Sequence, residues 1–205
     1  MTFETSAEIT AIVRPAWCEV EPVVVVDRAA AMDEPLRQAA IAMRTATESA
    51  DVTAAVRTMY KRVGIDPTKT RPSSEALLRR VRRGDEVPRI NSLVDIINWC
   101  SLESQLPFGL YDAARIQGAV TLRLGAAGEE YAGIRKDAVH VAGRLTLADD
   151  AGPFGNPTSD SARTMVTVAT TRALVVIFAP AGLAPSAVDR VLAQTRQRIA
   201  TFCQS

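Results

Sequence analysis

The sequence predicts an α+β domain with a helical N-terminal part, a central, mainly antiparallel β-sheet and a C-terminal helix. Three observations lead to this prediction. From Ala29 to Arg62 there is no glycine, and apolar residues recur at helical spacing. Beyond Tyr111 the apolar residues alternate in short segments separated by glycine turns. After Pro185 the spacing becomes helical again. Helices gathered before and after a largely antiparallel sheet are typical of the α+β class.

The first predicted element is a short buried strand at residues 23–26, because four consecutive valines favour a pleated core position. The region from Ala29 to Arg62 then fits amphipathic helix, broken near Asp51 or at Asp66-Pro67. Its helical stripe consists of Leu36, Ala40, Met43 and Ala50.

Two further helices are predicted in the middle of the chain. Ser73 or Ser74 can cap the first, which ends at Gly84 and directs Arg79, Arg80, Arg82 and Arg83 mostly outward. Its apolar face consists of Leu77, Leu78 and Val81. The second begins near Asn91, with a buried stripe of Leu93, Ile96, Ile97 and Cys100.

The C-terminal half is predicted to be mainly β. The expected strands are 120–124, 139–141, 144–147 and 173–178. The last of these is apolar enough to be central. Pro185 then opens a final helix, whose apolar side consists of Val188, Leu192, Thr195 and Ile199.

Length and composition limit the number of domains. With 205 residues and 47% hydrophobic content, the chain can bury one good core, so we expect a single domain over 1–205. Its parts are an N-terminal strand and helical region (1–70), a core (71–180) and the final helix (185–203). The N-terminus lacks signal-peptide features and no apolar run reaches membrane-spanning length, which predicts a cytoplasmic protein without membrane association.

The chemistry-bearing residues exclude several classes of site. Cys18, Cys100 and Cys203 form no CxxC pair, so we expect ordinary thiols, with no disulfide framework and no zinc site. The single histidine, His140, lies between two valines and is expected to be structural or exposed, although a neutral imidazole facing a pocket could act as a base. No motif implies a metal or a cofactor.

A basic cluster is the strongest charge feature. Between Arg57 and Arg83 there are nine Lys or Arg residues against Asp66 and Glu75, a local charge of +7 in a chain whose total is +1. One reading is a solvated helix face. The other is contact with an anionic partner. With 5% aromatic residues, base stacking is not expected.

Four blocks of sequence resemble one family. They are Gly64–Thr68, Arg71–Arg80, Arg89–Asp95 and Gly109–Asp112, and weaker similarity continues to about residue 180. In order and spacing they are similar to the B3/B4 domain, the editing module of the bacterial phenylalanyl-tRNA synthetase beta subunit, and more closely to free-standing proteins built of little else. The resemblance implies a B3/B4-like fold and hydrolysis of the ester between an amino acid and the terminal ribose of a tRNA.

Two departures from the editing domain bear on specificity. Where that domain carries a Gly-Gly-Glu element whose glutamate recognises the tyrosine hydroxyl, this chain reads Gly155-Asn156-Pro157. Where it carries a histidine in Pro-Leu-His-Ala-Phe-Asp, this chain has Gly109, as free-standing relatives do. The resemblance therefore does not imply tyrosine specificity.

The loop at residues 149–163 is the candidate site. It combines glycines, prolines, hydroxyls, an amide and carboxylates, and is expected to be either a rigid link or a pocket wall. In an editing site Asn156, Thr158, Ser159 and Asn91 would hold a water or the aminoacyl group. The expected substrate pocket adds Asp95, Gly109, Tyr111, Asp112, Phe154 and Gly155. The expected RNA contacts are Arg79, Arg80, Arg82, Arg83 and Arg89.

These features support one main hypothesis and two alternatives. The first is an aminoacyl-tRNA trans-editing hydrolase that needs no protein nucleophile, because an orienting pocket can direct water against an ester. The second is a non-catalytic tRNA- or RNA-binding module, and the third a small-molecule enzyme that reuses the amino-acid pocket. The expected partner is tRNA or aminoacyl-tRNA rather than DNA. Self-association stays open, since an exposed edge strand or the last helix could support a dimer.

Overall fold

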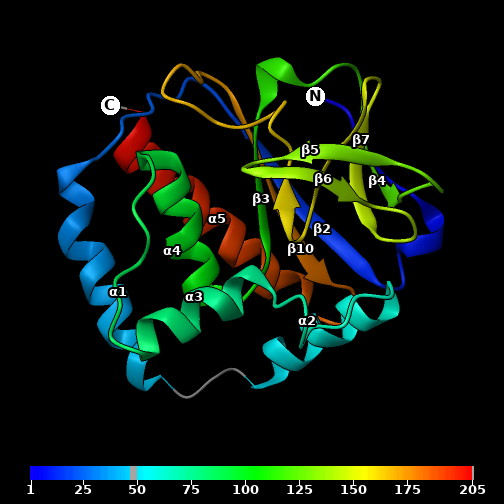
Figure 1. Cartoon of the computed structure of the whole chain (residues 1–205). Coiled ribbons are helices and arrows are strands. Elements are labelled where there is room, and N and C mark those ends of the chain that lie inside the picture. Colours follow the sequence, from blue (N-terminus) through cyan, green and yellow to red (C-terminus); the bar gives the residue numbers. More distant parts are fainter. Residues whose placement is uncertain (47–49, 205) are drawn as a thin grey trace.

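The computed structural model describes residues 1–46 and 50–204 and has the predicted α+β fold. Helices occupy one side of the molecule and most of the strands occupy the other (Figure 1). The helices are α1 (Asp33–Thr45), α2 (Ala50–Arg62), α3 (Ser73–Arg82), α4 (Ser92–Ser104) and α5 (Pro185–Cys203). Short 3-10 turns lie at Ala7–Ile9, Ala30–Met32 and Ala113–Arg115.

The strands form three sheets in the described part of the chain, of which two are fully antiparallel. The five-stranded sheet has the order β1 (Phe3–Thr5), β4 (Val120–Leu124), β7 (Leu145–Asp149), β8 (Gly152–Asn156) and β9 (Ser159–Asp160). Its only parallel pair is β1 with β4. The three-stranded sheet has the order β2 (Val13–Val20), β10 (Ala173–Pro180) and β3 (Phe108–Asp112). The remaining pair is β5 (Glu130–Gly133) with β6 (Lys136–His140).

Strand β10 is the centre of the core, as its apolar run predicted. All of its eight residues are buried, and it pairs with β2 on one side and β3 on the other. Helices α4 and α5 pack on each other and against this sheet. Arg198 of α5 stacks over the ring of Trp99 in α4 at 3.7 Å and forms an ion pair with Glu103 at 2.6 Å.

The predicted strand at residues 23–26 is wrong. The segment is extended, with Val23 and Val25 buried, but it pairs with no strand. Its backbone instead bonds to separate loops and helix ends: Val23 N donates to the Thr171 carbonyl and Val24 N to that of Cys203. The first long strand is β2, which the sequence reading missed. The β2 strand contains Pro15 and lies at a sheet edge, where proline is tolerated.

The helical predictions are confirmed with adjusted ends. The region from Ala29 to Arg62 contains α1 and α2; α1 ends at Thr45, before the expected break at Asp51, and residues 47–49 lie outside the described part. The N-cap residue of α3 is Pro72, and no serine side chain caps it, which corrects the expected Ser73 or Ser74 cap. Helix α4 is capped by Asn91, whose Oδ1 accepts from Val94 N at 2.9 Å. Helix α5 begins at Pro185, as predicted.

The segment 149–163, expected to be a loop, contains β8 and β9. Asn156 pairs with Ser159, so Pro157 and Thr158 form a tight turn between the two strands. Ser161 N also donates to the Phe154 carbonyl. This hairpin carries the polar residues of the predicted site on a sheet edge, which gives them a rigid support.

Candidate functional site

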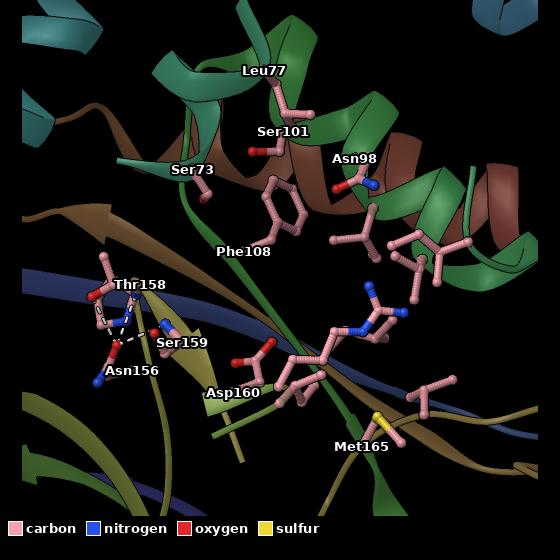
Figure 2. A pocket seen from close by; sticks show the side chains of 18 of the residues that line it. Ser73, Leu77, Asn98, Ser101, Phe108, Asn156, Thr158, Ser159, Asp160 and Met165 are labelled. Carbon is pink, nitrogen blue, oxygen red and sulfur yellow. Dashed lines mark hydrogen bonds between the residues drawn. The ribbon is translucent and has the colours of Figure 1, made fainter. Parts of the chain in front are cut away.

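A cavity of about 400 Å³ opens between the helices and the β8–β9 hairpin (Figure 2). One wall comes from the start of α3 and from α4, and the other from β3, the β5–β6 turn and the hairpin. The lining residues are Ser73, Leu77, Ile90, Asn91, Val94, Ile97, Asn98, Ser101, Phe108, Leu110, Ile134, Arg135, Asn156, Pro157, Thr158, Ser159, Asp160, Met165 and Val166. About half of these are apolar, and an apolar pocket with a few polar groups is the usual form of a small-ligand site.

Asn156 builds the hairpin turn on the polar wall. Its side-chain carbonyl accepts three hydrogen bonds, from Thr158 N at 2.8 Å, Thr158 Oγ1 at 2.9 Å and Ser159 N at 2.9 Å. Asparagine commonly stabilises a turn by bonding the backbone two residues on. The Asn156 carbonyl is therefore committed to the turn, and its amide NH2 is the part of the side chain with hydrogen-bonding capacity to spare.

Asn91 holds a similar position on the opposite wall. Its Oδ1 caps α4, which again leaves the amide NH2 for other contacts. All four residues predicted to hold water or the aminoacyl group, Asn91, Asn156, Thr158 and Ser159, thus line one cavity although they come from segments 65 residues apart in the sequence.

Asp160 is the carboxylate in this cavity. It follows Ser159 at the end of β9, and its side chain lines the cavity, below Phe108 in the view of Figure 2. Burial raises the pKa of Asp160 to about 7, while the nearby Tyr111 hydroxyl and Leu110 backbone N–H act in the opposite direction with smaller effect. A carboxyl group with this pKa changes its charge near neutral pH, which is typical of functional positions.

Tyr111 is not part of the cavity lining but is a direct neighbour of Asp160, which is. Its side chain is fully buried and meets the Phe154 ring edge-on, with centroids 5.0 Å apart. Gly109 and Gly155 flank its phenol end, since a Cβ at either position would lie within 2.7 Å of the ring carbons. The hydroxyl makes no hydrogen bond of normal geometry within residues 1–46 and 50–204. Burial, and then the charge of Asp160, raise the pKa of Tyr111 well above its usual value.

The six residues expected to complete the pocket, Asp95, Gly109, Tyr111, Asp112, Phe154 and Gly155, are not among the residues that line the cavity. Tyr111, Phe154, Gly109 and Gly155 form the packed layer just described. Asp112 accepts hydrogen bonds from Thr170 Oγ1 at 2.9 Å and Ala114 N at 3.0 Å.

Asp95 is buried at the start of α4, away from the cavity lining. It accepts from Ile90 N at 2.7 Å and from Arg89 Nε at 2.6 Å. Arg89 also pairs with Asp33 and donates to the Ala29 carbonyl, so its guanidinium is engaged within the protein. Asp95 and Arg89 together fix the segment that carries Asn91.

The other predicted RNA contacts, Arg79, Arg80, Arg82 and Arg83, are exposed at the C-terminal end of α3. Arg80 Nε donates to the Glu86 carbonyl at 2.7 Å, and Arg83 pairs with Asp85 at 3.5 Å. Ser73 and Leu77 of α3 line the cavity, and the arginines begin two residues beyond Leu77, toward the other end of the helix.

His140 and the cysteines lie apart from this cavity. The His140 ring is exposed on β6, and its Nδ1 lies 2.9 Å from Glu130 Oε2 across the hairpin. Cys18, Cys100 and Cys203 are free and buried. No three metal-ligating side chains gather among the described residues, and no helix in that part of the chain has the length and apolar character needed to cross a bilayer.

Sequence reasoning missed two kinds of lining residue. Asp160 was counted in the polar segment but not selected, although an acid directly after Thr158 and Ser159 was a usable signal. Ser73, Asn98 and Ser101 from α3 and α4, and Arg135 from the β5–β6 turn, carried no such signal, because only the folded chain brings these turns of helix opposite the hairpin.

Three comparisons bear on this arrangement. A family model described as the B3/4 domain matches residues 55–198, well over half of the chain. The chain is also similar to the phenylalanine–tRNA ligase beta subunit of Chromobacterium violaceum, with 33% identity over 84 residues. That match spans 40% of this chain and 11% of that subunit.

The fold is similar to that of a solved structure. It is the crystal structure of an N-terminal fragment of the phenylalanyl-tRNA synthetase beta subunit from Pyrococcus horikoshii, with a TM-score of 0.51 and 12% identity. The match covers 98% of this chain and 48% of that one. At this identity the likeness establishes the fold and nothing more.

Proposed function

This chain belongs to the B3/4 domain family, and from that membership and the chemistry of its cavity we propose that it hydrolyses mischarged aminoacyl-tRNA. The observation that carries the proposal is that one helix, α3, contributes both to the cavity and to the cluster of exposed arginines. The N-terminal half of α3 lines an apolar cavity with a polar wall, and four exposed arginines lie at the C-terminal end of the same helix. An aminoacyl group in the cavity and the phosphates of the RNA on the arginines would use both.

The chemistry needs little from the protein beyond orientation. An ester is reactive enough for a positioned water to attack it, and fixing the two reactants together can lower the barrier by several kcal/mol. The NH2 groups of Asn91 and Asn156 are donors with spare capacity, on opposite walls, for the water or for the developing negative oxygen. Such a reaction would take place in the cytoplasm, where tRNA is charged.

A non-catalytic tRNA-binding module is the second candidate, and one observation favours it. The side-chain carbonyls of Asn91 and Asn156 are both committed to a helix cap and a turn. These two residues can therefore be explained by folding alone. The basic face of α3 would then be the functional surface and the cavity a structural feature.

The test is deacylation of a panel of correctly and incorrectly charged tRNAs by the wild type and by Asn156→Asp. This variant keeps the Oδ1 acceptor of the turn and removes the NH2 donor, so it separates catalysis from folding. We expect selective hydrolysis of mischarged tRNA by the wild type and a loss of about 100-fold in the variant, the usual effect of removing one such donor. Arg190→Ala, an exposed arginine on α5, is the matched control.

Each outcome decides between the candidates. Selective hydrolysis that falls in Asn156→Asp and is unchanged in Arg190→Ala supports the hydrolase. Salt-sensitive tRNA binding without hydrolysis of any charged tRNA replaces it with the binding module. Absence of both binding and hydrolysis removes tRNA as the substrate and leaves the small-molecule enzyme.

A further inference from the structure

The Asp160 carboxyl group lines the cavity, and among the side chains that the structure describes none forms an ion pair with it. Its neighbours include the Tyr111 hydroxyl and the Leu110 backbone N–H. Arg135 lines the same cavity but does not pair with it. An enclosed carboxylate without a counter-ion is costly, and proteins normally offset such a charge by pairing it. A cation brought by a ligand would complete this site.

The surroundings of Asp160 define the rest of that ligand. The cavity that Asp160 lines also has an apolar part, to which two helices, one strand and one loop contribute. The residues concerned are Leu77, Val94, Ile97, Phe108, Leu110 and Met165. A ligand with one positive group next to an apolar body matches this lining, and a volume of about 400 Å³ accommodates a single amino-acid residue with room for its attachment.

We propose that Asp160 binds the α-ammonium group of an apolar amino acid, held in the cavity either free or as the aminoacyl ester of tRNA; the ester form rests on the proposed function. An ammonium group offers three donors and a full charge, and a charge-assisted hydrogen bond to a carboxylate is roughly twice as strong as a neutral one. Recognition by the ammonium group, which all amino acids share, leaves selectivity to the apolar wall.

Tyr111 is a positioning residue in this proposal. It is held between Gly109 and Gly155 and faces Asp160 from β3. Tyr131 faces it from β5, and its pKa is raised by burial and then by the charge of Asp160. Neither phenol titrates near neutral pH, so the carboxylate is the group whose charge changes there. Ammonium binding would favour the ionised carboxylate and release its proton.

The experiment compares ligands that differ only in the amine. The probes are 3′-deoxy-3′-(L-phenylalanylamino)adenosine, in which an amide replaces the labile ester, its leucyl counterpart, and the desamino form of each. Free L-phenylalanine and L-leucine form the second arm. Calorimetric titration of the wild type at pH 7 is expected to show binding of the amine-bearing compounds roughly tenfold or more tighter than of the desamino forms. It is also expected to show proton release, seen as a dependence of the enthalpy on the buffer.

The variant Asp160→Asn keeps the shape of the side chain and removes the charge. We expect it to bind the amine and desamino forms with equal, weak affinity and to release no proton. A merely structural role of Asp160 would change neither the preference for the amine nor the proton release. If only the free amino acids bind, the ester form is wrong and the ammonium site stands.

Two outcomes overturn the proposal. The first is the absence of any preference of the wild type for the amine, including the absence of binding. The second is an unchanged preference in Asp160→Asn; combined with lost deacylation, this would assign the carboxylate to the attacking water. Deacylation that persists while the amine preference is absent defeats this proposal and leaves the proposed function intact. An Asp160-dependent amine preference without deacylation supports the ammonium site and overturns the proposed function.

Discussion

At the scale of single residues, the packing next to Asp160 depends on two glycines that accommodate one tyrosine. An added Cβ at Gly155 would lie 2.6 Å from two ring carbons of Tyr111, and at Gly109 the distance would be 2.7 Å. The ring cannot move aside easily, because it is fully buried against Phe154. Both glycines are therefore required because they leave room for the Tyr111 ring. They affect the site through this packing and not through contact with a ligand.

We predict that Gly155→Ala destabilises the protein by about 1–3 kcal/mol, the usual cost of overpacking a core. Urea unfolding measures this change. Combining it with Tyr111→Leu, which shortens the opposing side chain, should cost less than the sum of the two single changes. Gly182→Ala is the control, because a Cβ there would meet no atom within 4 Å. Equal effects at Gly155 and Gly182 would show that the tyrosine does not set the requirement.

Asp160 is predicted to reduce stability as the pH rises. Its pKa in the folded state is about 7, whereas an unfolded aspartate has a pKa of about 4. Between these values the unfolded chain loses its proton while the folded chain keeps it, so unfolding is favoured increasingly as pH rises through this window. The full effect, up to about 4 kcal/mol, is reached above the folded pKa.

The measurement is the free energy of unfolding of the wild type and of Asp160→Asn at pH 4.5 and pH 8. The variant should gain stability relative to the wild type between the two conditions, since it carries no ionisable group at this position. Other titrating groups are common to both proteins and cancel in the difference. A difference that stays constant with pH would mean that the carboxyl titrates normally in the fold.

At the scale of elements, the start of α4 is fixed by an ion network. Arg89 joins Asp95, which is fully buried, to Asp33 at the start of α1. This network and the Asn91 cap together set the direction in which α4 leaves the cavity wall. Arg89 was predicted to contact RNA and Asp95 the substrate; in the structure both also hold the segment that carries Asn91.

Arg89→Ala is predicted to destabilise the fold by about 3 kcal/mol, because it leaves the Asp95 charge buried without its partner. The matched control is Arg28→Ala. Arg28 pairs with the same Asp33, but its side chain is 63% exposed, and such a pair contributes at most about 1 kcal/mol. Chemical denaturation of both variants decides the matter: comparable small losses would free Arg89 for a role in RNA binding.

The elements differ in how far the sequence predicts them. The buried faces of α3, α4 and α5 follow from helical spacing, and the core strand β10 follows from its apolar run. The valine run at 23–26 carries the same local signal as β10 but finds no strand to pair with, so its backbone bonds to loops and helix ends instead. Pairing is a long-range property that a local pattern does not contain.

The candidate site divides in the same way. Asn156, Thr158 and Ser159 could be selected because one turn brings them together, and turn chemistry is local. Asn91 was selected through a resemblance rather than from spacing. The significance of Asp160 depends on its enclosure by β3, β5 and the helices, which only the folded chain provides.

At the scale of the whole molecule, helix α3 is the element that links the cavity to the basic face. Ser73 and Leu77 of this helix line the cavity, and its last two turns carry Arg79 and Arg80, with Arg82 and Arg83 close behind. Arg57, from the same basic cluster, is bound to Glu75 through two hydrogen bonds of 2.8 and 2.7 Å. Of the exposed basic residues in this cluster, four lie together at the C-terminal end of α3.

Replacing Arg79, Arg80, Arg82 and Arg83 with alanine is predicted to weaken tRNA binding and to reduce its dependence on salt. Each phosphate contact releases counterions, so the loss of four contacts should lower the slope of log affinity against log salt by about three. Titration of labelled tRNA from 50 to 300 mM salt measures this slope. The same change should leave the binding of the phenylalanylamino adenosine probe unaltered, because the cavity itself stays intact. If affinity falls without any change in slope, the arginines act through the fold and do not contact phosphates. The basic face would then not be a tRNA-binding surface that serves the cavity.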